Sequence, residues 1–214
     1  GPLGRLTELL APERSSTDNS APVPIHLDRA ALESPQLAMA NAVRDTLRLG
    51  DVVEKMFRDY KIAFEKNDAT LLQKVHSADE SIKDFNAGIK SYLTELGRES
   101  LEEEDELRCT EIMTFTTNME NIGNIVVLNM SELLERSATD QVAYAKEDIE
   151  DHHKLFEMLL ANLKLSFTVF LTQDEAQANA LLKSKQALRD KERKAVNAHL
   201  ERLRKWPTMD EVSS

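Results

Sequence analysis

The sequence predicts an all-α protein made of two tandem antiparallel three-helix bundles. The first observation is composition: six glycines, 5% aromatic, 41% apolar and 30% charged residues among 214 are typical of helix-rich chains and unfavourable for sheets. The second is periodicity, because apolar residues recur at steps of three and four over long segments. The third is that short polar stretches with helix-capping residues separate these segments.

The N-terminal region differs from the rest. Residues 1–4 (Gly-Pro-Leu-Gly) resemble the remnant of a cleaved tag and are set aside as a cloning scar. Residues 5–32 contain Pro12, Pro22 and Pro24 with a Ser-Ser-Thr-Asp-Asn-Ser run, a composition that predicts a flexible linker. A linker here suggests that another segment precedes this domain, whereas an ordinary floppy N-terminus is the alternative.

Residues 33–138 are expected to form the first three-helix bundle. Ser34 is placed to cap a helix over 34–66, with Pro35 in its first turn. Asn67-Asp68 precede a second helix that ends at Gly97, and a capping box at Ser100 opens a third that ends near residue 137. The expected apolar stripe of the first helix comprises Leu37, Ala40, Val43, Leu47, Gly50, Val53, Phe57, Tyr60 and Phe64.

Residues 139–214 are expected to form a second, incomplete bundle. Its helices run from about 145 to 171 and from a capping box at Thr172–Glu175 to near Trp206. The two halves repeat at an offset of 106 residues, which places Phe64 on Phe170. On the same offset a sixth helix starts at the T-x-x-E box Thr208–Glu211 and is cut short at Ser214. A truncated sixth helix would leave an apolar groove exposed, which favours self-association.

The charge of the chain excludes one class of partner. Lys plus Arg number 27 and Asp plus Glu 38, a net charge of −11, so we expect no nucleic-acid partner. Residues 183–205 are the exception, with nine basic residues against Asp190, Glu192 and Glu201. This segment could meet anionic headgroups, phosphate or the acidic residues 99–106 of another copy, or it could be an ordinary solvated helix. We expect no membrane-spanning segment, because no run of about 18 apolar residues stands out.

Candidate chemistry is confined to carboxylates. Asp79 and Glu80 in the second helix and Glu120 in the third lie at comparable depths, and carboxylates from neighbouring helices could hold a cation. The alternative is a solvated polar face beside Gly123, a packing glycine. Glu150 and His153 form a single E-x-x-H, whereas di-iron bundles need two copies. The sequence contains no nucleophile elbow, phosphate-binding glycine loop or H-E-x-x-H, so we expect neither catalytic residues nor a bound cofactor.

Several stretches resemble a known family. They are Leu-Glu-Ser-Pro-Gln-Leu-Ala at 32–38, Asn-Met-Glu-Asn-Ile-Gly-Asn at 118–124, Asn-Leu-Lys-Leu at 162–165, Leu-Arg-Asp-Lys-Glu-Arg at 188–193 and Val-Ser-Ser at 212–214. With tandem three-helix bundles and paired acids, the chain resembles the PhoU family. More specifically, it is similar to the C-terminal PhoU-like domain of bacterial sodium/phosphate cotransporters.

The resemblance implies regulation of phosphate movement. It implies a cytosolic domain at the cytoplasmic face of the bacterial inner membrane, which docks through helix faces on the transport domain of the same polypeptide and gates phosphate uptake. A homodimer is a further expected partner. The alternatives are a free-standing PhoU-type regulator of phosphate import and signalling, and a metal-carboxylate helical-bundle enzyme.

The resemblance also bears on metal binding. Some PhoU-like proteins bind metal clusters through E/D-x-x-x-D motifs, but here Lys83 follows Asp79 and Asn124 follows Glu120 at that spacing. An ammonium cannot ligate a cation and an amide is a weaker ligand than a carboxylate. We therefore expect no resident metal. A transition metal, if one bound, would use Asp79, Glu80 and Glu120, with Asp84 as a substitute acid.

Overall fold

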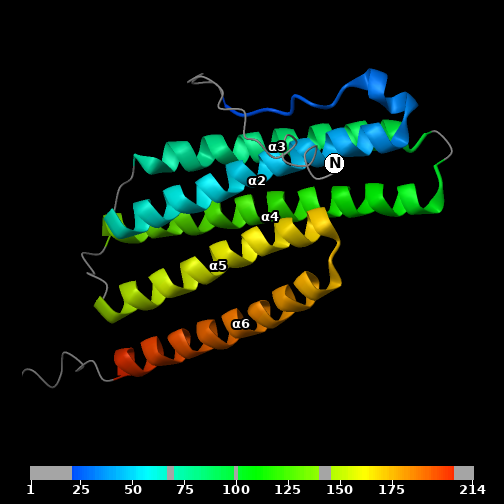
Figure 1. Cartoon of the computed structure of the whole chain (residues 1–214). Coiled ribbons are helices and arrows are strands. Elements are labelled where there is room, and N and C mark those ends of the chain that lie inside the picture. Colours follow the sequence, from blue (N-terminus) through cyan, green and yellow to red (C-terminus); the bar gives the residue numbers. More distant parts are fainter. Residues whose placement is uncertain (1–20, 67–69, 99–100, 140–145, 205–214) are drawn as a thin grey trace, which may run out of the picture.

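The computed structural model describes residues 21–66, 70–98, 101–139 and 146–204, and within them it contains helices and no strand (Figure 1). The predicted all-α class is confirmed. The capping expectations at Asn67-Asp68, Ser100 and Thr208, the truncated sixth helix and residues 1–20 lie outside the described residues. The elements are η1 (Arg29–Glu33), α2 (Pro35–Lys66), α3 (Leu71–Leu96), α4 (Glu103–Thr139), α5 (Lys146–Thr172) and α6 (Glu175–Arg204).

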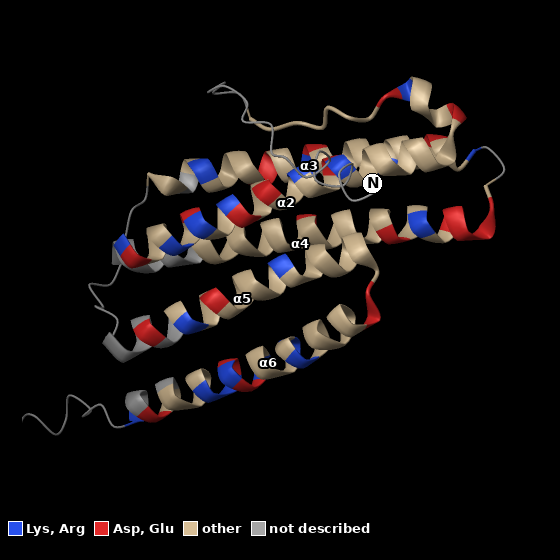
Figure 2. Ribbon diagram, in the orientation of Figure 1, with Lys and Arg blue, Asp and Glu red and all other residues tan. Residues whose placement is uncertain are grey.

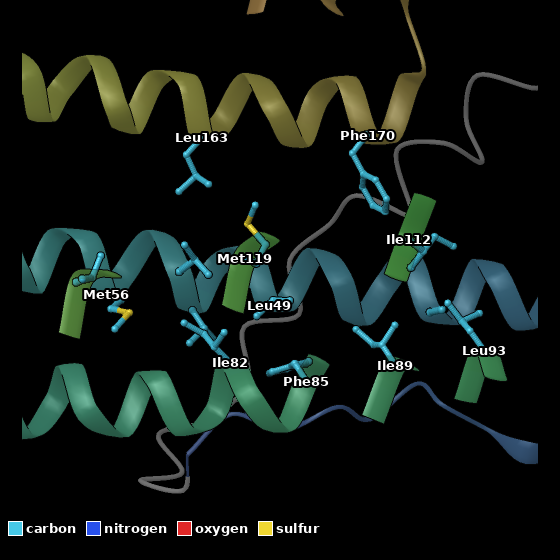
Figure 3. Packing of buried hydrophobic residues seen from close by; sticks show 14 of the residues in the cluster. Leu49, Met56, Ile82, Phe85, Ile89, Leu93, Ile112, Met119, Leu163 and Phe170 are labelled. Atoms are coloured by element: carbon cyan, nitrogen blue, oxygen red, sulfur yellow. The ribbon is translucent and has the colours of Figure 1, made fainter. Parts of the chain in front are cut away.

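Helices α2, α3 and α4 form an antiparallel bundle around one apolar core (Figure 1). The helices pack side by side because each has a continuous apolar face and the connections between them are short. Figure 3 shows side chains from all three helices meeting in the interior. The fully buried members include Leu49, Met56, Ile82, Phe85, Ile89, Leu93 and Ile112.

The buried face of α2 lies beside the expected stripe. Leu37 and Ala40 are exposed, whereas Ala38 and Ala42 are completely buried. The reason is that α2 contacts α3, α4 and α5, so it is covered over a wide arc in which small residues permit close approach. A line traced through the larger apolar residues therefore misses part of the true core face.

Helix α5 packs on the first bundle as a fourth helix. Phe167 of α5 lies directly over Gly50 of α2. A β-carbon added at Gly50 would lie within 3.0 Å of three atoms of the Phe167 ring and would clash with it. Phe115 of α4 stacks on Phe170 with ring centroids 4.3 Å apart, and Leu163 and Phe170 point from α5 toward the interior (Figure 3). The close seat of α5 thus depends on a glycine in α2 and on aromatic contacts to α4.

Two ion pairs also join α5 to α2. Lys61 Nζ lies 2.6 Å from Glu157 Oε1, and Lys164 Nζ lies 3.3 Å from Glu54 Oε1. The Lys61 ammonium lowers the pKa of Glu157, and the Arg58 guanidinium, followed by Lys164, lowers the pKa of Glu54. These pairs are partly exposed, so each contributes modestly and fixes register more than stability.

Helix α6 packs chiefly against α5 and has no fully buried side chain among its described residues. Ser184 of α6 donates a hydrogen bond to Asn162 of α5. The half-buried side chains of α6 recur at steps of three and four, and they include Ala178, Leu181, Ser184, Leu188, Ala195 and Ala198. The helix therefore presents a single contact stripe, and most of its circumference faces solvent.

The start of α6 uses a different cap from the expected one. Asp174 Oδ1 accepts hydrogen bonds from the backbone nitrogens of Ala176 at 2.7 Å and Gln177 at 3.1 Å. The capping box expected at Thr172 is wrong by two residues, because Gln173 adopts a positive φ of 52° and the helix begins after that turn. Thr172 instead accepts a hydrogen bond from the backbone of Asp174.

Residues 21–34 lie along the bundle rather than away from it (Figure 1). The fully buried carboxylate of Asp45 accepts hydrogen bonds from the backbone nitrogens of Ile25 and His26, at 3.1 and 2.8 Å. Tyr92 donates a hydrogen bond to the Asp28 carbonyl oxygen at 2.8 Å. Part of the segment expected as a linker is thus held against α2 and α3 by main-chain contacts that composition does not encode.

Helix α5 contains one stretch, His153–Thr172, that is long and apolar enough to cross a membrane by length and composition alone. The expectation that no such stretch occurs is therefore wrong. In this structure Phe156, Leu160 and Phe170 of the stretch are buried against the first bundle, and Glu157 pairs with Lys61. A core helix of a helical bundle has the same composition, so the stretch is weak evidence for a membrane span.

Enlarging Gly50 should dislodge α5. We expect Gly50→Leu to lower the free energy of unfolding by about 1–3 kcal/mol, because the new side chain overlaps the Phe167 ring. Urea unfolding followed by circular dichroism measures the change. Gly97→Leu is the matched control, since Gly97 is exposed with φ −70° and no atom within 3.4 Å of an added β-carbon. Equal losses at both positions would contradict the proposed role of the Gly50–Phe167 contact.

Neutralising Asp45 should release residues 21–28. We expect Asp45→Asn to reduce stability by about 1–3 kcal/mol, because the amide can satisfy only part of the backbone donors that the carboxylate accepts. Amide hydrogen exchange at Ile25 and His26 should accelerate while exchange in α3 changes little. Unchanged protection at these two amides would show that the carboxylate does not hold the segment.

Candidate functional site

The outward face of α4 is uncharged over most of its described length. Between Ile112 and Ser131 the only charged residue is Glu120, and Figure 2 shows the charges of α4 concentrated at its N-terminal end. The exposed residues Thr114, Asn118, Asn121, Ile125 and Leu128 follow each other on this face at steps of four and three. Leu107 lies on the same line seven residues before Thr114, with the half-buried Glu111 between them. A long exposed stripe without charge is unusual in a chain with 30% charged residues, and it is typical of a contact surface.

A groove adjoins this stripe where α4, α5 and α6 meet. It has a volume of about 520 Å³ and is bordered by Thr110, Thr114 and Asn118 of α4, Ser166 and Val169 of α5 and Leu181 of α6. Phe115 and Phe170 also line it. Hydroxyl and amide groups beside apolar side chains can bind a helix or loop of a partner, but they do not provide a nucleophile with a base.

The rim of the groove is held by Arg108. Its guanidinium donates to Glu111 at 2.9 Å and to the Phe170 carbonyl oxygen at 3.0 Å, and it lies 4.9 Å from the centroid of the Phe170 ring. Gln173 also donates to Glu111, at 3.0 Å. The charged groups at the rim are thus engaged with each other and join α4 to the end of α5. The groove could not be predicted from the sequence, because its residues come from three helices with no shared motif.

The expected metal-binding acids are arranged around a lysine. Asp79 is buried on α3, and its Oδ2 lies 2.5 Å from Lys83 Nζ. Glu80 is exposed, and its Oε1 lies 3.4 Å from the same ammonium. The neighbouring carboxylates, Asp79 first, raise the pKa of Lys83, which stays charged at neutral pH. The lysine thus supplies the positive charge that Asp79 needs in its buried position.

Glu120 has a different partner. It accepts a hydrogen bond from the Asn86 amide across the interface between α3 and α4. Gly123 of α4 sits against Asp79, since an added β-carbon would lie 3.1 Å from Asp79 Oδ1. The structure thus supports Gly123 as a packing glycine. The hydrogen bond from Asn86 was not foreseen, although its spacing of seven residues from Asp79 places it on the same face of α3.

These residues do not fit a metal ion. Asp79, Glu80 and Glu120 do not come together as three ligands, and no group of three or more His, Cys, Asp or Glu side chains in the described part of the chain is arranged to hold one. The Lys83 ammonium would also repel a cation at Asp79. Asp79 Oδ1 and Asn86 Oδ1 are buried without a hydrogen-bond partner among the described residues. The interface between α3 and α4 is therefore polar at this point, and these two oxygens are inaccessible to solvent.

The E-x-x-H pair is engaged elsewhere. His153 Nδ1 lies 3.1 Å from Glu65 Oε1 of α2, and Lys154 rather than His153 lies near Glu150, at 3.9 Å. Cys109 is buried, and burial raises the pKa of its thiol, so it is a poor nucleophile at neutral pH. The candidate site that the described residues offer is therefore the uncharged face of α4 with its adjoining groove.

Metal analysis tests the interpretation of Lys83. The protein is treated with a chelator, incubated with Mn²⁺, Fe²⁺ or Zn²⁺ and desalted. We expect it to retain less than about a tenth of an equivalent of metal, because the Lys83 ammonium is paired with the Asp79 and Glu80 carboxylates. Lys83→Asp should retain more, since it replaces the cation by a further ligand. Lys83→Arg is the control and should bind as little as the unmodified protein. Stoichiometric metal with Lys83 in place would overturn this interpretation.

The chain is similar to one domain family and to several curated proteins. The PhoU domain family matches residues 46–134, which span most of α2, all of α3 and most of α4. Over 180 residues the chain is 34% identical to a protein of Escherichia coli (strain K12) named "Putative inorganic phosphate export protein YjbB". A protein of the same name from Salmonella typhimurium is 34% identical over 182 residues. No solved structure matches the chain.

The matched relatives are much longer than this chain. The matches cover 84% of this chain but 33% of each relative, so the chain spans about a third of the length of these curated relatives. The PhoU match lies entirely within the part of the chain that forms the first bundle. Residues 46–134 of this helical chain therefore match the PhoU domain family, and 84% of the chain is similar to one third of proteins named for inorganic phosphate export.

Proposed function

We propose that this chain is a regulatory domain of a sodium-dependent phosphate transporter, located at the cytoplasmic face of the bacterial inner membrane. The observation that carries the proposal is the 34% identity over most of this chain to one third of proteins named for phosphate export. The proposed partner is the counterpart of the other two thirds of these relatives. The uncharged α4 face is a suitable surface for that partner.

The proposed mechanism is docking rather than chemistry. The α4 stripe exposes Leu107, Ile125 and Leu128, and burying such side chains against a partner is favourable because it removes apolar surface from water. The absence of charge along the middle of this stripe avoids the desolvation of unpaired ions that would oppose association. Binding of this face to the transport domain would favour one conformation of the transporter and so gate phosphate movement.

The resemblance seen in the sequence and the name of the relatives differ in the direction of phosphate transport. The resemblance to sodium/phosphate cotransporters implies gating of uptake, whereas the name of the relatives specifies export. The regulatory domain would act on either direction in the same way, by stabilising one conformation. Sodium coupling rests on the resemblance to sodium/phosphate cotransporters, and the flux measurement below includes it.

The two alternatives predict different observations. A free-standing PhoU-type regulator would be encoded without membrane-spanning segments beside it, so sequencing the gene on both sides of this segment separates it from the transporter domain. Several apolar spans of about 20 residues would support the proposal. The metal-carboxylate enzyme has no support in the described residues, because they contain no cluster of metal ligands.

Charges placed on the α4 face should uncouple the domain. In the full-length protein we expect Ile125→Glu with Leu128→Glu to change phosphate flux at least severalfold, because two carboxylates would have to be desolvated on docking. Uptake and efflux of radiolabelled phosphate, with and without a sodium gradient, measure the effect. Gln73→Glu with Ser77→Glu is the matched control, which adds two charges to an exposed face of α3.

The comparison of the α4 pair with the α3 pair decides whether the α4 face regulates the transporter. Altered flux with the α4 pair but not the α3 pair would support docking through α4. Unaltered flux in both directions, with normal amounts of folded protein, would overturn the proposal that this face regulates the transporter. If the α4 pair changes phosphate flux equally without a sodium gradient, the proposed sodium dependence is wrong and the regulatory role stands.

A further inference from the structure

Helix α6 carries a concentration of positive charge in an acidic protein. Lys183, Lys185, Arg189, Lys191, Arg193 and Lys194 fall within 12 residues that contain only Asp190 and Glu192 as acids, whereas the whole chain has a net charge of −11. Figure 2 shows these basic residues along α6, which is the outermost helix on its side of the molecule. The segment therefore creates a local positive field that the rest of the chain opposes.

The exposed side chains of α6 are sorted by face. One exposed stripe recurs at steps of three, four, four, three and four residues, so its members lie on one line along the helix. Its members are basic or apolar, and the exposed Glu192 borders it: Leu182, Lys185, Arg189, Arg193, Val196 and Leu200. Leu182, Val196 and Leu200 are 63%, 53% and 47% exposed, so the apolar members are not used in packing on α5.

The rest of α6 does not share this pattern. The half-buried residues that face α5 lie on a separate stripe through Leu181 and Leu188. On the other exposed flank Lys183 and Lys194 alternate with Asp190 and Glu201. Among the members of the basic–apolar stripe, Arg193 makes an ion pair with Asp190 at 3.1 Å, at the border between the two exposed faces. The combination of basic residues and exposed leucines is thus concentrated on one face, where Arg193 is the member with an ion pair to an acid.

We propose that the Leu182–Leu200 stripe of α6 binds the surface of an anionic phospholipid bilayer, with the helix axis parallel to the membrane. Arg and Lys at the centre of the stripe would contact the lipid phosphates, and the leucines near both ends would enter the headgroup region. The stripe is about 27 Å long, which matches a helix lying on a surface. This inference goes beyond the proposed function, because it concerns the orientation of the domain and holds whichever protein the α4 face contacts.

Charge and apolar exposure together favour a bilayer over the other candidate ligands. Free phosphate can neutralise arginines but cannot remove water from three exposed apolar side chains. An acidic protein surface, such as residues 102–106 of a second copy, offers carboxylates and little apolar area, since Glu102, Glu103, Glu104 and Glu106 are all exposed and charged. An anionic bilayer offers both a negative surface and an apolar layer beneath it.

Sedimentation with lipid vesicles tests the proposal. We expect the full chain to bind vesicles of phosphatidylcholine with phosphatidylglycerol and not vesicles of phosphatidylcholine alone, with affinity falling as salt rises. Arg189→Glu with Arg193→Glu should weaken binding at least about thirtyfold, because each basic residue near an anionic surface contributes a factor of about five and reversal adds repulsion. Lys183→Glu with Lys194→Glu is the matched control, with the same charge change on the other flank of the same helix.

A charge-neutral pair separates bilayer insertion from simple attraction. Leu182→Ser with Leu200→Ser should weaken vesicle binding without altering net charge, provided circular dichroism shows unchanged helicity. Failure to bind anionic vesicles at low salt would overturn the proposal, and so would equal losses from both lysine and arginine pairs. Competition by inorganic phosphate at constant ionic strength would assign the site to free phosphate instead. A dimer in analytical ultracentrifugation that Arg189→Glu with Arg193→Glu abolishes would assign it to a second copy.

Discussion

The contact of Phe167 with Gly50 is the constraint on which the arrangement of the second half depends. Helix α6 packs chiefly on α5, so its position depends on how α5 packs on α2. That seat needs a residue without a side chain at position 50, because the Phe167 ring occupies the place of a β-carbon. The stacking of Phe115 on Phe170 joins α4 to α5, and both rings line the groove beside this contact.

Buried charge is used twice in the first bundle, each time with a local compensation. Asp45 is fully buried, but backbone N–H groups of residues 25 and 26 donate to it, and this attaches an extended segment to α2. Asp79 is buried beside Gly123 and is neutralised by Lys83 one helical turn away. In both cases an isolated carboxylate would be strongly unfavourable, and the compensating group comes from the chain itself rather than from a bound ion.

The helices were largely predictable from the sequence, but the contacts between them were not. The expected helix over 34–66 is found at Pro35–Lys66, because a Ser-Pro start and a long apolar period are local signals. The Thr172 box failed since the left-handed backbone of Gln173 shifts the start of α6 to Asp174. The role of Asp45 and the Asn86–Glu120 bond could not be predicted, because each joins residues distant in sequence, 20 and 34 positions apart. Lys83 is the intermediate case, because its spacing of four residues from Asp79 places both on one face of α3, and its ammonium lies beside the carboxylate.

The surface of the protein divides into regions of different character, and this division follows from the packing. Helix α4 begins with the acidic residues 103–106 and continues as an uncharged face, while α6 gathers basic residues on the far side of α5 (Figure 2). Acids at the N-terminus of α4 are favourable because they complement the positive end of the helix dipole. Because α5 stands between α4 and most of α6, the uncharged and basic faces are held apart on separate helices. Two partners of different chemistry could therefore be bound at once, one through apolar contact with α4 and the other through charge on α6, and the rigid seat of α5 on Gly50 would keep their relative orientation constant.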